Sequence, residues 1–337
     1  MECSCCCAAV YVTIAIAIYF IVQHYLKKLV VPNWDKRHVF VTGCDSGFGH
    51  LLALQLAAHK FHVYAGCFTH KGAEELKKKA QSSGIGSKLE TIPLDVTSQE
   101  SVDRAFDVVE KKLGHFGLWG LVNNAGSLGV NGPDDWLTVA DYQSVMDINA
   151  MGVIRVSQKF KPLVKKAKGR LVTVASVLGR VALKSAGPYC MSKYACEAYM
   201  DVLRQEMRHF GVSVHILEPG TFRQTGLLER EMMDRMQENV WKRTSESTKL
   251  EYGATFFQKW KEAQDKLVKL LDNGDPQKVA DAYFHALTAR YPKRRYVIGI
   301  DSMLLWIPMS MLPTCIQDWL WALLEKLHGS LVPDAVK

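Results

Sequence analysis

Short apolar runs rich in β-branched residues alternate with helical stretches from Lys36 onward, and no other feature constrains the fold as strongly. Strands that are apolar along their whole length must be buried on both faces, as they are in a parallel sheet covered by helices. The alternation therefore predicts an α/β fold with a doubly wound parallel sheet of the Rossmann type. A chain of 337 residues suits one such domain with additions at its ends.

The expected strands are His38–Gly43, Phe61–Cys67, Leu89–Val96, Leu118–Gly126, Arg170–Ser176, Val212–Gly220 and Arg295–Ile300. The expected helices are Leu51–His59, Ser101–Leu113, Tyr142–Lys166, Tyr189–Phe210 and a helix that Asp275-Pro276 opens and that runs to about Ala289. Between Thr221 and Leu271 the alternation gives way to charged helical sequence. We expect this segment, residues 221–271, to line a substrate pocket.

The first predicted strand ends in a glycine-rich turn, TGCDSGFG, over Thr42–Gly49. Glycines at positions 43, 47 and 49 let the backbone approach a pyrophosphate, whose negative charge is favoured at the start of the following helix. Turns also attract glycine for purely conformational reasons. The turn alone is therefore a modest indication of a dinucleotide site.

Further motifs follow this turn in a fixed order: NNAG at Asn123–Gly126, then Asn149, Ser176, the Tyr189-x-x-x-Lys193 pair and Pro219-Gly220. Together with TGxxxGxG they resemble the short-chain dehydrogenase/reductase family over residues 36–220. The stretches TGCDSGFG, GLWGLVNNAG and KGRLVTVASVLGRVA, with the C-terminal IP and LP pairs, resemble its branch of microsomal retinol dehydrogenases and 17β-hydroxysteroid dehydrogenases. D-3-hydroxybutyrate dehydrogenase, a close relative of that branch, shares the first two.

This resemblance implies a dehydrogenase domain over residues 36–300 whose catalytic residues are Asn149, Ser176, Tyr189 and Lys193. It also implies a nicotinamide cofactor bound by Gly43, Asp45, Ser46, Gly47, Gly49, Asp95, Asn123, Tyr189, Lys193, Pro219 and Gly220. Asp95 has an alternative role, because an aspartate at a strand end often only caps a turn. The family usually carries a threonine soon after the Pro-Gly turn, but Thr225 comes one place late here, so the carboxamide contact stays unassigned.

An alcohol that loses a hydride also needs a base for its hydroxyl proton, and the ordinary pKa of tyrosine, about 10, is too high for efficient work at neutral pH. Lys193 lies one helical turn after Tyr189 on the same face, so its positive charge favours the phenolate. Ser176 ends a strand and can donate a hydrogen bond to the substrate oxygen. In the family, the residue corresponding to Asn149 holds a water that links the lysine to solvent.

The region after the second strand, Gly66–Lys71, lacks the acidic residue that commonly holds the ribose of NAD. Lys71 could be taken for a ligand of the NADP 2′-phosphate. Asp45 in the glycine turn would repel that phosphate. We therefore expect NAD, with NADP less favoured.

Composition excludes several other classes. The 42 lysines and arginines exceed the 34 acidic residues, giving a formal charge of +8, but they are scattered and form no stripe typical of nucleic-acid binding. The nine cysteines show no zinc-ligand spacing, so we expect no metal site. Isolated thiols favour a domain that faces the cytosol.

Ala8–Leu26 is a run of 19 residues without a formal charge, which as a helix would span about 28 Å of bilayer. No basic segment precedes it and no small-x-small cleavage site follows, so residues 1–28 are interpreted as a membrane anchor, not a signal peptide. Lys27, Lys28, Lys36 and Arg37 follow the span. The positive-inside rule then predicts a single-pass protein of the endoplasmic reticulum membrane whose catalytic domain faces the cytosol. Palmitoylation of a nearby cysteine cluster is left open: Cys3, Cys5, Cys6 and Cys7.

The C-terminal segment, residues 301–337, holds two apolar runs, Met303–Leu312 and Cys315–Leu324, each too short to span a membrane. They suit a membrane-associated segment, a lid over the pocket, or a core strand and helix. The leading function is interconversion of a hydrophobic alcohol, a retinol or hydroxysteroid, and its carbonyl. The alternatives are D-3-hydroxybutyrate oxidation and a non-catalytic membrane-bound binding protein. The physiological direction and a homodimer are left open.

Overall fold

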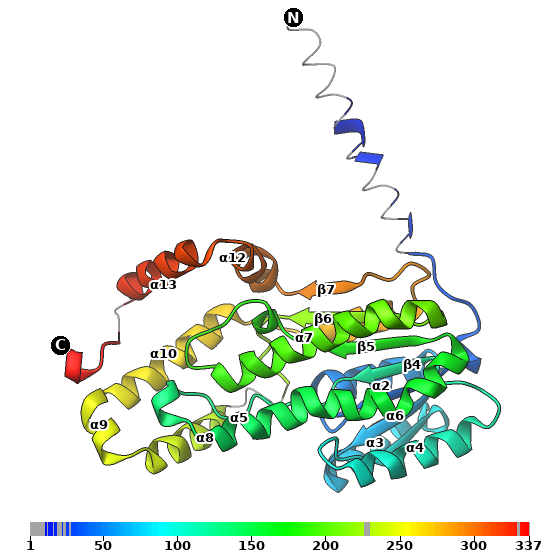
Figure 1. The fold of residues 1–337 in the computed structure, drawn as a ribbon. Helices are drawn as coiled ribbons and strands as arrows, with labels where there is room; N and C mark the ends of the chain where they lie inside the picture. The colour runs from blue at the N-terminus through cyan, green and yellow to red at the C-terminus, as the bar shows by residue number, and fades with distance from the viewer. Residues whose placement is uncertain are drawn as a thin grey trace, which may run out of the picture.

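The computed structural model describes residues 11, 13–15, 17–18, 22, 25–26, 28–225, 230–328 and 331–336. At the centre of this described chain is a parallel sheet of seven strands in the order β3-β2-β1-β4-β5-β6-β7 (Figure 1). The chain winds outward from β1 to β3, then crosses back to β4 and winds outward again. The predicted doubly wound sheet of the Rossmann type is therefore confirmed.

The strands are β1 (His38–Thr42), β2 (His62–Cys67), β3 (Leu89–Pro93), β4 (Gly120–Asn123), β5 (Arg170–Val174), β6 (Ser213–Pro219) and β7 (Arg295–Ile298). The helices are α2 (Gly47–Ala58), α3 (His70–Ser82), α4 (Gln99–Leu113), α5 (Val139–Met146), α6 (Gly152–Ala167), α7 (Gly187–Met207), α8 (Arg230–Arg243), α9 (Glu246–Tyr252), α10 (Phe256–Leu271), α11 (Gln277–Thr288), α12 (Ile307–Ser310) and α13 (Thr314–His328).

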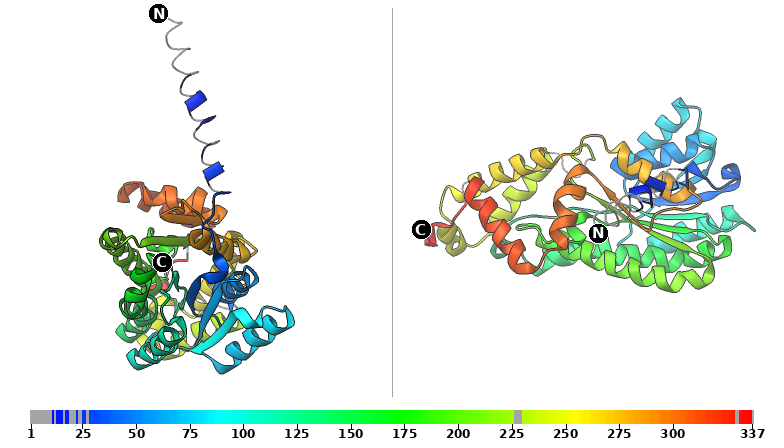
Figure 2. Two further views of the ribbon diagram at one scale, coloured as in Figure 1. Left: turned by 90° about the vertical axis from the view of Figure 1, so that its right-hand side faces the viewer. Right: turned by 90° about the horizontal axis from the view of Figure 1, so that it is seen from above.

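Helices cover both faces of the sheet and produce two hydrophobic cores (Figures 1 and 2). On one face, Val39 and Val41 of β1 pack in a core that includes side chains of α2, α3 and α11. On the other, Phe40 packs with side chains of α4, α6 and α7, and its ring stacks on Phe160 at 4.5 Å between centroids. Successive side chains of a strand point to opposite faces, so an all-apolar strand serves both cores.

Two local features differ from the sequence predictions. The expected elements did not include α3, which is capped by the Thr69 hydroxyl accepting from the Gly72 amide at 3.0 Å. The helix expected over Tyr142–Lys166 is instead α5 and α6, joined by one π-helical turn, η4 (Asp147–Met151). Such turns are often found at functional sites, because they alter the direction of a side chain within a helix.

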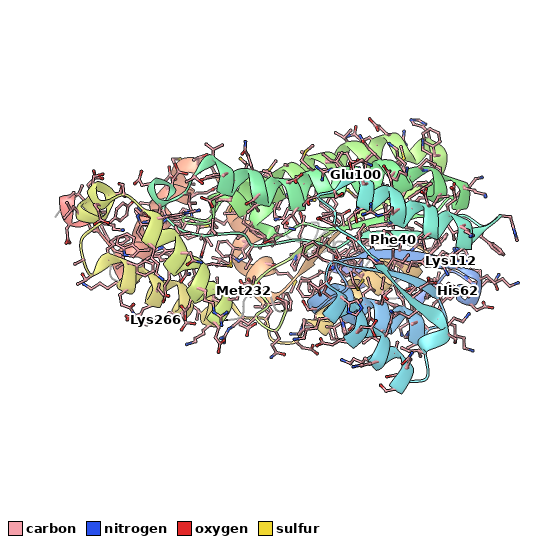
Figure 3. The ribbon with its side chains drawn as sticks, turned by 90° about the horizontal axis from the view of Figure 1, so that it is seen from below. Phe40, His62, Glu100, Lys112, Met232 and Lys266 are labelled. Atoms are coloured by element: carbon pink, nitrogen blue, oxygen red, sulfur yellow. The ribbon has the colours of Figure 1, made fainter. Side chains whose placement is uncertain are left out.

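The segment after β6 extends beyond the carboxyl ends of the strands. Figure 3 shows Lys266 on α10 towards one end of the molecule and Met232 on α8 nearer its middle, whereas His62 and Lys112 lie towards the other end. Ligands of doubly wound proteins bind outside the carboxyl ends of the strands, where the strand order reverses. Here the order reverses between β1 and β4, so a site is expected beside the ends of these two strands.

The predicted anchor, residues 1–28, lies largely outside the described residues. Among the residues that are described, no helix is both long and apolar enough to cross a membrane. The chain enters the domain where Val30 bridges to Ala289 and the Val31 amide donates to the Thr288 carbonyl at 2.8 Å, so this entry point is fixed to the end of α11.

The two C-terminal apolar runs are helical, and neither contributes a strand. A π-helical turn, η7 (Ser302–Trp306), precedes α12 and α13. Trp306 and Met309 are buried against Val177 and Val181, which follow β5. Other apolar side chains of the segment are exposed, including Leu304 at 76%, Met311 at 73% and Trp319 at 62%. The segment therefore has one packed side and one apolar side in contact with solvent.

Candidate active site

The glycine turn after β1 lies against the backbone that follows β4, at the place where the strand order reverses. Gly43 has a φ of +68°, and a Cβ there would lie 2.7 Å from the Ala125 Cα atom. A Cβ on Gly49 would overlap the Asn124 side-chain nitrogen. Ser46, the N-cap residue of α2, makes no side-chain capping bond. This open helix start, reached by a turn with glycines at positions 43, 47 and 49, fits the diphosphate of a dinucleotide.

Two residues that sequence reasoning did not select hold this turn in place. The Thr42 hydroxyl accepts hydrogen bonds from the backbone amides of Asn124 at 3.0 Å and Ala125 at 2.9 Å. The Asn124 amide group donates to the carbonyls of Thr42 and Gly43, both at 2.9 Å. Both residues belong to motifs already recognised in the sequence. Only the pairing of β1 with β4 shows that they bind each other.

Asp45 reaches from the glycine turn to the end of β2. One carboxylate oxygen accepts from the Phe68 amide at 2.9 Å, and the other accepts from the Thr69 amide and hydroxyl, both at 2.7 Å. A Cβ on Gly72 would lie 2.7 Å from the Asp45 Cβ, so α3 begins directly against this side chain. A carboxylate is therefore fixed at the end of β2, where the β2 sequence itself provides none.

Asp95 and Asn123 make mainly structural contacts. One Asp95 oxygen accepts from the Thr97 amide at 2.9 Å and hydroxyl at 2.7 Å, which closes the turn after β3. The Asn123 amide donates to Ser157 at 2.9 Å and Thr173 at 3.2 Å, joining β4 to α6 and β5. Asn123 therefore points into the core, and its neighbour Asn124 is the residue that contacts the glycine turn.

Tyr189 and Lys193 lie one turn apart at the start of α7. The Lys193 ammonium lies 5.5 Å from the centroid of the Tyr189 ring and donates to the Val174 carbonyl at 3.2 Å. Lys193 is 4% exposed, so its charge acts in a region largely shielded from water. The bond to Val174 at the end of β5 keeps the ammonium beside the sheet instead of in solvent.

Ser176 follows β5 by two residues and caps the short helix η5 (Val177–Gly179). Its oxygen accepts from the Leu178 amide at 3.2 Å, and its hydroxyl donates to the Pro219 carbonyl at 3.4 Å. The serine is thereby placed between the ends of β5 and β6. The long bond to Pro219 leaves its hydroxyl hydrogen available to a closer acceptor.

Asn149 occupies the π-helical turn η4 and is 1% exposed. Its side chain accepts from the Ser127 amide and donates to the Ser127 carbonyl, both at 2.8 Å, and donates to the Ser192 hydroxyl at 3.0 Å. Ser192 in turn donates to the Tyr189 carbonyl at 2.7 Å. A Cβ on Gly126 would lie 3.2 Å from Asn149 and 3.7 Å from the Lys193 ammonium, so both side chains face this glycine.

The Pro219-Gly220 turn is packed too closely to accept a side chain. A Cβ on Gly220 would overlap one carboxylate oxygen of Asp301, and the other oxygen accepts from the Thr221 amide at 3.0 Å. Thr225, left unassigned from sequence, has its carbonyl oxygen 2.7 Å from the position of a Cβ on Gly47. The late threonine therefore still lies against the glycine turn.

The profile of the short chain dehydrogenase family matches residues 37–235, more than half of the chain. The chain belongs to the short-chain dehydrogenase family. It is 44% identical to retinol dehydrogenase 5 of Homo sapiens, over 83% of this chain and 86% of that protein. It is 42% identical to 17-beta-hydroxysteroid dehydrogenase type 6 of Rattus norvegicus, over 96% of this chain and 99% of that protein.

A solved short chain dehydrogenase/reductase from Burkholderia phymatum, determined in complex with NAD, superposes with a TM-score of 0.66 at 22% identity. The superposition covers 83% of this chain and 94% of that one. At this identity the likeness concerns the fold alone. As a member of this family, the protein is an oxidoreductase. Most of its predicted site residues lie near the carboxyl ends of β1, β4, β5 and β6. The two exceptions are Asp95, which follows β3, and Asn123, which points into the core.

Proposed function

We propose that this dehydrogenase interconverts a hydrophobic alcohol, a retinol or a hydroxysteroid, and its carbonyl compound with NAD, using Tyr189 as the acid/base. One observation carries the proposal: the Lys193 ammonium lies 5.5 Å from the Tyr189 ring centroid and donates to the carbonyl of Val174, two residues before Ser176. At that place the ammonium can stabilise negative charge that develops on the Tyr189 oxygen during proton transfer. The relatives named above are retinol and hydroxysteroid dehydrogenases, which supports the substrate class.

Each polar side chain of this site has a separate task. Tyr189 accepts the alcohol proton during oxidation and returns it during reduction. Ser176 donates its hydroxyl hydrogen to the substrate oxygen as negative charge develops there. Lys193 stabilises the phenolate, and Asn149 fixes the backbone of Tyr189 through Ser192. A bound nicotinamide supplies the hydride acceptor or donor.

The cofactor's diphosphate would be held by the turn with Gly43, Ser46, Gly47 and Gly49, and Pro219-Gly220 would border its nicotinamide. The fixed carboxylate of Asp45 at the end of β2 supports a preference for NAD, because it accepts hydrogen bonds and repels a 2′-phosphate.

The surroundings of Ser176 favour an apolar substrate over D-3-hydroxybutyrate. Val177 and Val181 form a hydrophobic cluster with Trp306 and Met309 next to the serine. A hydroxybutyrate carboxylate would need a cationic partner in the pocket. The nearby Arg180 is already paired with Glu218 at 2.9 Å.

The test replaces Tyr189 with phenylalanine, which keeps the ring and removes the ionisable hydroxyl. We expect Tyr189→Phe to bind NAD normally but to lose at least about 10²-fold in kcat with retinols or hydroxysteroids, measured by NADH absorbance. Tyr194→Phe is the matched control, because Tyr194 lies on the same helix and is 43% exposed. Near-normal turnover by Tyr189→Phe would refute the assignment. Turnover of hydroxybutyrate alone would favour the alternative substrate.

We further infer attachment to the endoplasmic reticulum membrane with the domain in the cytosol. The support is the uncharged run Ala8–Leu26 and the exposed apolar side chains of the C-terminal segment, among them Leu304 and Trp319. Figures 1 and 2 draw α12, α13 and the start of the described chain on the same upper side of the domain. One bilayer could therefore meet both. Protease protection of the domain in sealed microsomes would contradict the orientation.

A further inference from the structure

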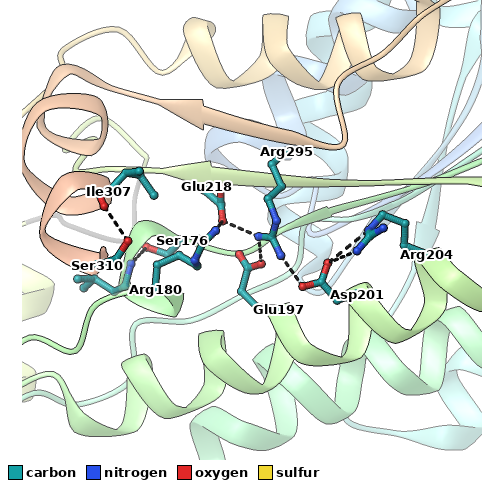
Figure 4. A network of polar contacts seen from close by, with 10 residues as sticks. Ser176, Arg180, Glu197, Asp201, Arg204, Glu218, Arg295, Ile307 and Ser310 are labelled. Atoms are coloured by element: carbon teal, nitrogen blue, oxygen red, sulfur yellow. Dashed lines mark hydrogen bonds and ion pairs between the residues drawn. The ribbon is translucent and has the colours of Figure 1, made fainter. Parts of the chain in front are cut away.

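A network of charged side chains lies directly behind the proposed site (Figure 4). It contains three carboxylates and three guanidinium groups: Arg180, Glu197, Asp201, Arg204, Glu218 and Arg295. One Arg295 nitrogen donates to both Glu218, at 2.6 Å, and Glu197, and the other donates to Asp201 at 2.6 Å. None of these residues is among the catalytic or cofactor-binding residues predicted from the sequence.

The network joins the elements that carry the proposed site. Glu218 is the residue before Pro219, and Arg180 follows η5, which Ser176 caps. Glu197 lies one turn after Lys193 on the same face of α7. A Cβ on Gly179 would lie 2.9 Å from Glu197 and 3.0 Å from the Lys193 carbonyl, so η5 and α7 are in close contact here.

Two carboxylates of the network are deeply buried, Glu218 at 0% and Glu197 at 5% exposure. Each has one buried oxygen without a hydrogen-bond partner, while the other oxygen of each binds the same Arg295 nitrogen. Two buried carboxylates beside one guanidinium repel each other, and an unpaired buried oxygen is costly. If one of the two carboxyl groups is protonated, the repulsion between them disappears. The proton also provides a hydrogen-bond donor for one of the two oxygens that lack a partner.

We propose that Glu197 is a positioning residue of this site that holds a proton shared with Glu218 near neutral pH. This proposal rests on the proposed function for its catalytic part. Burial, followed by the charge of Glu218, raises the pKa of Glu197 to about 7, while Arg295 opposes the rise. Arg180, which follows η5, also acts on Glu197, and Lys193 and Asp201 lie one helical turn before and after it on α7.

The sign of the pH effect follows from this raised pKa. The proton stays on Glu197 below about pH 7 and is released above it. In the unfolded chain a glutamate already ionises near pH 4.3. Stability from Glu197 is therefore largest below about pH 4.3 and is lost as the pH rises to about 7, above which the group is ionised in both states. Release of the proton places two buried carboxylates beside Arg295 and loosens the contact between η5, α7 and the Pro219 turn.

Glu197→Gln tests the proposal, because glutamine imitates the protonated acid and cannot ionise. Between about pH 5.5 and about pH 8.5 we expect the Tm of the full-length wild-type protein in detergent to fall by about 3 °C relative to this variant. Over the same range, the kcat/KM of the variant divided by that of the wild type should rise roughly tenfold. A tenfold change corresponds to the free energy of a shift by one pKa unit. Glu206→Gln, an exposed position on α7, should follow the wild type in both measurements.

Parallel Tm curves for wild type and Glu197→Gln would overturn the shared proton. Diverging Tm curves with a constant kcat/KM ratio would overturn the positioning role. If Glu197→Gln does not fold, Glu218→Gln replaces it as the test. Because this variant lacks the charge that repels Glu197, its Tm should fall at lower pH than the Tm of the wild type. A pH dependence of Tm identical to that of the wild type would refute the proposal. Absence of turnover with every alcohol would refute the proposed function, while the Tm comparison would still decide about the proton.

Discussion

Replacing Asp45 separates two tasks that the structure gives to one carboxylate. The side chain accepts three hydrogen bonds from Phe68 and Thr69, at 2.7–2.9 Å, and it places a negative charge at the end of β2. Asp45→Asn keeps one accepting oxygen and removes the charge, whereas Asp45→Ala removes both. The two variants therefore distinguish repulsion of a 2′-phosphate from support of the turn.

The magnitude of the charge effect follows from Coulomb's law. A unit charge within about 6 Å of the phosphate repels it by about 0.7 kcal/mol in water and about 2.8 kcal/mol at an effective dielectric constant of 20. Asp45 is partly exposed, so an intermediate value of about 2 kcal/mol applies, which is roughly 30-fold in an equilibrium or rate ratio. Loss of the three bonds in Asp45→Ala should lower the free energy of unfolding by about 2 kcal/mol.

The assay compares kcat/KM with NAD and with NADP for the wild type and both variants. We expect the wild type to prefer NAD and Asp45→Asn to reduce that preference roughly 30-fold, with a smaller loss of Tm than in Asp45→Ala because one oxygen can still accept from Thr69. Asp45→Ala should narrow the gap similarly but unfold at lower temperature. A wild-type preference for NADP would show that Lys71, not Asp45, reads the ribose. An unchanged preference in Asp45→Asn would show that the carboxylate only supports the turn.

Three shorter predictions concern the lysine, the glycine turn and the anchor. Lys193→Ala should weaken NAD binding and also lower kcat, so a change in only one of the two in titration and turnover assays would contradict its double role. Thr42→Val should lower the free energy of unfolding by about 2–3 kcal/mol, because two backbone amides lose their buried acceptor. Denaturant unfolding measures this loss, and a value under about 0.5 kcal/mol would contradict the prediction. Deletion of residues 1–28 should release much of the protein from membranes in flotation assays, whereas full retention would assign anchoring to the C-terminal segment.

Local sequence was sufficient for the sheet and the catalytic motifs. Apolar runs such as His38–Thr42 are buried along their whole length, and periodicity predicts that directly. The Tyr189 and Lys193 spacing fixes both side chains on one helix face whatever surrounds the helix. Helix α3 was missed because its sequence is mostly polar and few of its residues are buried, among them Leu76 and Ala80.

Only the tertiary structure decided which distant residues meet. Glu197, Glu218 and Arg295 come from a helix and two strands, and nothing local in the chain marks them as partners. Asp45 reaches the end of β2 because β1 and β2 pair in parallel, so their carboxyl ends lie side by side. Local sequence determines which residues point the same way along one element. Contacts between elements depend on strand order and register, which are set by the packing of the whole core.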